Sequence, residues 1–112
     1  GAANLRDNAE LITALQEESG KGKTISAICA APIVLARAGL LKDKNYTCYD
    51  GFEEEIQDGH YQKETVVKDG NLLTSRGPST ALALAYALVD HFGGNAQSLR
   101  QGMLYQDVFG DA

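Results

Sequence analysis

With 112 residues and 44% hydrophobic side chains, the chain has the size and composition of one domain with a core of its own. Its formal net charge of −5, without any cluster of Lys and Arg, argues against nucleic acid and anionic membrane as partners. No apolar run approaches the roughly 20 residues of a membrane span, and no signal peptide is recognisable. The two cysteines make a poor disulfide framework, so a reducing, cytoplasmic setting is expected.

The first half of the chain predicts two helices around a buried strand. Apolar residues at helical spacing predict a helix over residues 5–19, with Asp7 or Asn8 as its cap. Residues 23–29 show little polar alternation, which is typical of a strand that is covered on both faces. A short helix is expected over residues 30–38, because a proline stands in its first turn and a glycine follows its end.

The second half predicts a hairpin between short elements. Residues 46–49 indicate a strand, and residues 64–75 a hairpin with Asp-Gly at its turn. Residues 78–94 and 96–104 indicate two further helices. This order predicts an α/β layered domain with a mostly parallel sheet. Since a first helix in such a domain normally follows a first strand, we expect the chain to be the later part of a domain.

The most distinctive local feature is the cysteine at the end of the strand over residues 23–29. A strand that ends in a nucleophile and opens at once into a helix is the nucleophile-elbow arrangement. The sharp turn raises the side chain above the sheet, while free N–H groups at the helix start favour a thiolate and a developing oxyanion. The alternative is that Cys29 is a small buried residue in a strand-to-helix turn.

Three stretches, "AICAAP", "GHY" and "VKDGNLLTSRGPSTA", occur in this order along the chain. Together they resemble the ThiJ/PfpI superfamily, and most closely its branch of Parkinsonism-associated protein deglycases. The resemblance implies a flavodoxin-like three-layer sandwich with a mostly parallel sheet, a homodimer, and one easily oxidised cysteine at the elbow.

The resemblance also implies roles for single residues. Cys29 matches the family's elbow cysteine, and the backbone N–H of Ala30 matches a donor of its oxyanion site. His60 matches the histidine described as assisting proton transfer. Three further residues match the turn beside the same pocket: Arg76, Gly77 and Pro78.

The chain departs from the family pattern in two ways. The glutamate that accompanies the elbow cysteine comes from near the start of the full domain, and a Gly-Gly pair precedes the stretch that residues 1–5 resemble; neither is found here. In addition, Ala30 stands where the peptidase branch has a histidine. We therefore expect residues 1–112 to be the C-terminal portion of a single domain, with the N-terminal strands on a separate segment that acts as its partner. Peptidase chemistry is not expected.

The resemblance implies a cysteine-dependent glyoxalase or deglycase that acts on small dicarbonyls such as methylglyoxal, or on their adducts. The alternative is a redox sensor or chaperone that is switched by oxidation of Cys29. No metal and no cofactor are expected, since Cys29 and Cys48 form neither a CxxC spacing nor a disulfide framework. A structural role is expected for Cys48.

Overall fold

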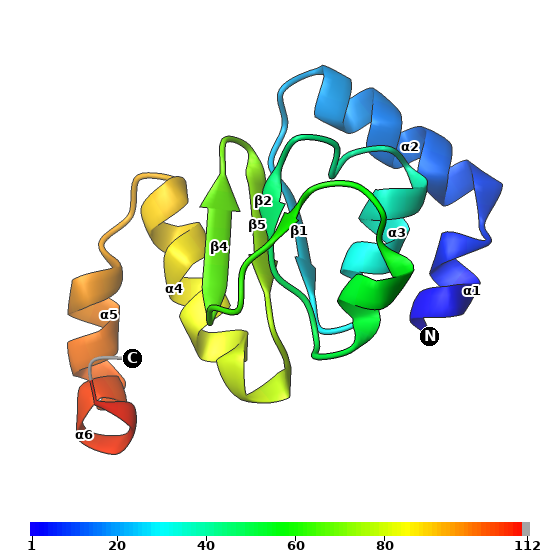
Figure 1. Ribbon diagram of the computed structural model, residues 1–112. Coiled ribbons are helices and arrows are strands. Elements are labelled where there is room, and N and C mark those ends of the chain that lie inside the picture. The colour runs from blue at the N-terminus through cyan, green and yellow to red at the C-terminus, as the bar shows by residue number, and fades with distance from the viewer. Residues whose placement is uncertain (111–112) are drawn as a thin grey trace.

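The computed structural model describes residues 1–110, which form helices on both sides of a short sheet (Figure 1). The strands are β1 (Ile25–Ile28), β2 (Asn45–Tyr46), β3 (His60–Tyr61), β4 (Val66–Asp69) and β5 (Leu72–Ser75). The helices are α1 (Ala2–Arg6), α2 (Ala9–Gly20), α3 (Pro32–Arg37), α4 (Ala81–His91), α5 (Ala96–Gly102) and α6 (Tyr105–Phe109). Two short 3₁₀ segments, η1 (Phe52–Glu55) and η2 (Pro78–Thr80), complete the elements.

The main sheet has the strand order β1-β5-β4. β1 pairs with β5 in parallel, and β4 pairs with β5 antiparallel because a two-residue turn joins them. Gly70 in that turn has a φ of 61°, a conformation that glycine adopts without strain. The predicted α/β flavodoxin-like class is thus confirmed, with a mixed three-stranded sheet in this part of it. β2 and β3 form a separate parallel pair.

The two faces of the main sheet are covered by different helices. Ile25, Ala27 and Leu72 join the largest buried cluster, which includes the apolar side of α3. α4 packs against β5 and β4, and Figure 1 shows it on the other side of the sheet. Successive side chains of a strand face opposite ways, and all four residues of β5, Leu-Leu-Thr-Ser, are buried, so this strand is covered on both faces.

The helix predicted over residues 5–19 is in fact two helices, α1 and α2. The break occurs because the side chain of Asn8 caps α2, accepting a hydrogen bond from the Leu11 N–H at 3.0 Å. Asn8 was one of the two caps expected from the sequence, although it starts the second helix and not the first. Within residues 1–110, no helix is both long and apolar enough to cross a membrane.

The strand predicted over residues 46–49 is shorter than expected. Beyond Tyr46 the chain leaves β3 and crosses the ends of the main strands. The Thr47 N–H donates to the side-chain oxygen of Thr74 at 2.8 Å, and the Tyr49 N–H donates to the Cys29 carbonyl at 2.8 Å. These acceptors take the place of a neighbouring strand, and they bring residues 47–49 to the carboxyl end of β1.

Candidate functional site

Cys29 follows directly after β1 and adopts a left-handed conformation with a φ of 65°. Residues with a Cβ are disfavoured there by roughly 1–2 kcal/mol. Hydrogen bonds hold the strained turn on both sides. The Cys29 N–H donates to the Ser75 carbonyl at 3.0 Å, and its carbonyl accepts from the Tyr49 N–H at 2.8 Å. The order strand, left-handed cysteine, helix has the geometry of a nucleophile elbow, and the side chain is partly exposed.

This backbone strain makes a prediction about stability. We expect Cys29→Gly to have a free energy of unfolding about 1 kcal/mol higher than Cys29→Ala, because glycine alone relieves the positive φ. At an ordinary helix position the order would be reversed. Urea unfolding of the two variants, each made in the full domain that includes the N-terminal strands, measures the difference. Equal stabilities, or a more stable alanine variant, would show that the turn is not strained.

The backbone after Cys29 offers a free hydrogen-bond donor. The Ala31 N–H donates to the Ile28 carbonyl at 3.1 Å, and α3 begins at Pro32, which has no N–H. The N–H of Ala30, which stands between Cys29 and Ala31, has no acceptor among residues 1–110. A free N–H next to a nucleophile can stabilise the negative oxygen that forms when the nucleophile attacks a carbonyl. This is the position that the sequence assigned to an oxyanion donor.

The turn that follows β5 lies beside the elbow. β1 and β5 are parallel neighbours with Ile28 opposite Ser75, so their carboxyl ends meet at one edge of the sheet. Arg76, Gly77 and Pro78 line a pocket of about 260 Å³ at this edge. The other residues that line it are Tyr49, Asp50, Thr65, Ser79 and Thr80. The structure thus brings the turn predicted at residues 76–78 next to Cys29.

Charges at this pocket are paired. A guanidinium N–H of Arg76 donates to the Asp50 carboxylate, and the Lys63 ammonium lies 3.7 Å from the same carboxylate. The hydrogen bond from Arg76 lowers the pKa of Asp50, so this carboxyl stays ionised at neutral pH. It therefore cannot serve as a proton donor there.

His60 does not contact Cys29 in this structure. It is exposed at the start of β3, opposite Asn45, and its backbone N–H donates to the Lys44 carbonyl at 2.8 Å. The preceding turn is fixed as well, because a Cβ at Gly59 would lie 2.6 Å from the Leu41 carbonyl oxygen. His60 pairs with Asn45, whereas the residue that bonds the Cys29 carbonyl is Tyr49, four residues further along the chain. The proton-transfer role of His60 stays a prediction.

Tyr49 is the residue at the site that sequence reasoning missed. Its N–H bonds Cys29, its half-exposed side chain lines the pocket, and its ring lies 3.4 Å from where a Cβ of Gly77 would stand. The ring also makes an edge-on contact with Phe52, with centroids 6.4 Å apart. The available signal was its place at the end of a predicted strand, since ligands of α/β sheets bind outside the carboxyl ends of strands.

Cys48 has the opposite environment. Its side chain is fully buried within the main apolar cluster. Burial raises the pKa of the Cys48 thiol to about 11, and the nearby carboxylates of Glu53 and Asp50 act in the same direction. A thiol with this pKa is almost entirely protonated at neutral pH, so Cys48 is a poor nucleophile. The environment fits the structural role expected for it.

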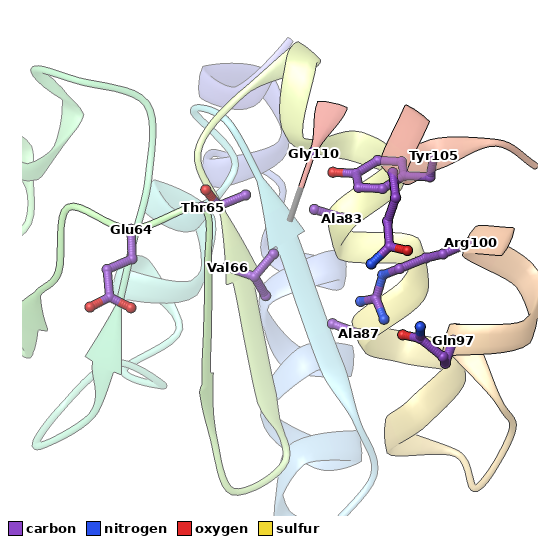
Figure 2. A pocket seen from close by; sticks show the side chains of 10 residues that line it. Glu64, Thr65, Val66, Ala83, Ala87, Gln97, Arg100, Tyr105 and Gly110 are labelled. Atoms are coloured by element: carbon purple, nitrogen blue, oxygen red, sulfur yellow. The ribbon is translucent and has the colours of Figure 1, made fainter. Parts of the chain in front are cut away.

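A larger hollow of about 670 Å³ lies between β4 and helices α4–α6. Figure 2 shows that side chains from all of these elements line it. Its lining residues are Glu64, Thr65, Val66, Ala83, Ala87, Gln97, Arg100, Tyr105, Gln106 and Gly110. The smaller pocket is the better candidate for a chemical site despite its size, because Tyr49, which lines it, donates its backbone N–H to the Cys29 carbonyl at the elbow.

Comparisons with known proteins bear on this site. The model of the DJ-1/PfpI family matches residues 1–91. Protein dj-1beta of Drosophila melanogaster is 38% identical over 110 residues, which are 93% of this chain and 58% of that protein. Glutathione-independent glyoxalase DJR-1.2 of Caenorhabditis elegans is 29% identical over 96 residues, covering 84% of this chain and 51% of that protein. The crystal structure of Drosophila melanogaster DJ-1beta superposes with a TM-score of 0.86 at 34% identity, covering 92% of this chain and 57% of that one. The chain thus spans little more than half the length of these relatives.

Proposed function

This chain belongs to the DJ-1/PfpI family, and on that premise we propose that it carries the nucleophile of a glyoxalase or deglycase that acts on reactive dicarbonyls. The observation that carries the proposal is the strained turn at Cys29 with the free N–H of Ala30 directly after it. A relative that is named a glutathione-independent glyoxalase supports the choice of substrate class.

The proposed reaction begins when the Cys29 thiolate adds to the aldehyde carbon of methylglyoxal, which forms a carbon–sulfur bond and an oxyanion. The Ala30 N–H stabilises this oxyanion. A base then moves a proton from the former aldehyde carbon to its neighbour, which gives a thioester of a hydroxy acid. Water hydrolyses the thioester, releasing lactate and the free thiol. By resemblance, the base is His60 or a glutamate of the preceding segment.

We also propose that residues 1–112 are the C-terminal portion of one domain that functions as a homodimer. Two observations support the first part. The chain spans 58% of the length of dj-1beta, and within residues 1–110 the outer edge of β1 pairs with no strand. We use "the complete domain" below for this chain together with the segment that supplies strands beyond β1. The homodimer rests on the family resemblance alone.

The second candidate function is a redox sensor or chaperone. The free N–H of Ala30 favours it, because this donor would stabilise a negatively charged, oxidised Cys29 as well as an oxyanion. The partial exposure of Cys29 favours it too, because a peroxide could reach the thiol. In this case a peroxide would convert the Cys29 thiolate to a sulfenate and then a sulfinate, without any turnover of a carbonyl compound.

Steady-state assay of the complete domain separates the two functions. The proposal expects methylglyoxal to be consumed and lactate to appear in equal amounts over many turnovers, without added glutathione. Consumption that stops after one equivalent, together with formation of a Cys29 sulfinate under mild peroxide, would favour the sensor and contradict the enzyme.

A further inference from the structure

The pocket beside Cys29 has hydrogen-bond donors that the protein does not use. Arg76 donates to Asp50 through Nη2 only, and its Nε and Nη1 groups have no acceptor among residues 1–110. The Arg76 side chain is 31% exposed, so it lines the pocket without being free in solvent. A guanidinium with one edge engaged and another free can bind a carboxylate through paired N–H donors.

The pocket lining carries one cation, Arg76, and one anion, Asp50. Asp50 is the only acidic side chain among its lining residues, and its carboxylate interacts with both Arg76 and Lys63. The Tyr61 hydroxyl lies 3.5 Å from the same carboxylate. The Asp50 carboxylate is thus neutralised by Arg76 and by Lys63, which lies outside the lining, and the unused N–H groups of Arg76 are the donors that the pocket offers to an anion.

The pocket also adjoins the backbone turn that carries the reactive cysteine, although Cys29 is not one of its lining residues. The Ser75 carbonyl, one residue before Arg76, accepts the Cys29 N–H at 3.0 Å, and Tyr49 links the pocket wall to the Cys29 carbonyl. The volume of about 260 Å³ corresponds to roughly nine water molecules at about 30 Å³ each. This is room for an acid of two to four carbons and not for a nucleotide or a peptide.

We propose that this pocket binds the carboxylate of a small aldehydic or 2-oxo acid through Arg76 while Cys29 attacks the neighbouring carbonyl carbon. The attack forms a carbon–sulfur bond, the carbonyl electron pair moves to oxygen, and the thiol proton ends on that oxygen, so no oxidant is needed. The inference rests on the proposed function and extends its substrate class from neutral dicarbonyls such as methylglyoxal to small carbonyl compounds that also carry a carboxylate.

The test compares two alkylating agents of nearly the same shape, iodoacetate with a carboxylate and iodoacetamide with a neutral amide. The rate at Cys29 is measured for each in the complete domain by peptide mass spectrometry. Both agents react with the thiolate, so their rate ratio cancels the thiolate fraction and reports on recognition of the carboxylate. Free cysteine gives the reference ratio.

We expect the iodoacetate to iodoacetamide ratio at Cys29 to exceed that of free cysteine about tenfold, as one charge-assisted pair would give. Arg76→Gln should return the ratio to the free-cysteine value. Asp50→Asn should raise it further, because it removes the competing carboxylate and leaves Arg76 in place. A loss of folding could not produce this increase. Arg37→Gln, a change of an exposed arginine in α3, should leave the ratio unchanged.

A ratio equal to that of free cysteine, or one that Arg76→Gln does not lower, would overturn the carboxylate site. These outcomes differ from failure of the proposed function. Turnover of methylglyoxal with a free-cysteine ratio would overturn the carboxylate site alone. A raised, Arg76-dependent ratio without any turnover would refute the enzyme and support the site.

Discussion

Replacing Cys29 with serine is expected to abolish turnover of methylglyoxal by the complete domain, a loss of more than about a thousandfold in kcat/KM. The reason is that the reaction needs an ionised nucleophile at the elbow, and a serine hydroxyl is far less acidic than a thiol. The turn itself should survive, because serine differs from cysteine in one atom and its backbone remains held by Ser75 and Tyr49.

Cys48→Ser is the matched control. It makes the same change at a fully buried thiol outside the pocket, and it should retain turnover within about threefold at a temperature well below unfolding. Lactate formation at saturating and at low methylglyoxal gives kcat and kcat/KM for both variants. Residual activity of Cys29→Ser close to wild type would remove Cys29 from the mechanism. An equal loss in both variants would point to a general structural defect.

The second large effect concerns stability. We expect residues 1–112, expressed alone, to lack a cooperative unfolding transition, and the complete domain to show one. β1 forms one edge of the sheet, and its sequence Ile-Ser-Ala-Ile carries neither a charge nor a proline to protect an exposed edge. Unpaired N–H and C=O groups along an apolar edge strand favour association with another chain.

Urea titration followed by circular dichroism, with sedimentation velocity on the same samples, tests this expectation. Several exposed apolar side chains on α5, α6 and their flanks add to the surface that the isolated chain leaves uncovered: Phe92, Leu99, Met103, Leu104, Val108 and Phe109. A monomeric chain of 112 residues with a single sharp transition would contradict the proposal that it is part of a larger domain.

The elbow could be predicted because its signal is local. A buried strand, a nucleophile and a proline at the start of a helix follow one another within a few residues, and the structure has this order with Cys29 in the left-handed conformation. The hairpin before Arg76 was also predicted from local residues, although its two turn residues are Gly70 and Asn71 and not the expected Asp-Gly, because Asp69 pairs with Leu72. Local chemistry fixes both features.

The surroundings of Cys29 could not be predicted in the same way, because they depend on contacts between distant segments. Tyr49 reaches the elbow only because the chain stops pairing with β3 after Tyr46, and the Thr47 N–H bonds the side chain of Thr74 in β5. His60 stays with the short strand pair, so a match of sequence motifs did not place it near the thiol in this structure. The helix predicted over residues 5–19 divides for a local reason, the cap formed by Asn8, which competes with an otherwise continuous apolar pattern.

The most direct measurement of the central claim is the rate of iodoacetamide alkylation at each thiol of the complete domain between pH 6 and 10, read by peptide mass spectrometry. The fold presents Cys29 at an open turn and buries Cys48, whose pKa is raised to about 11. The account predicts that at pH 7 Cys29 reacts at least about a hundredfold faster than Cys48, and that Cys48 becomes reactive only towards the upper end of the range. Equal rates at the two thiols, rising together with pH as a free thiol does, would mean that Cys29 is a packed cysteine and not a nucleophile.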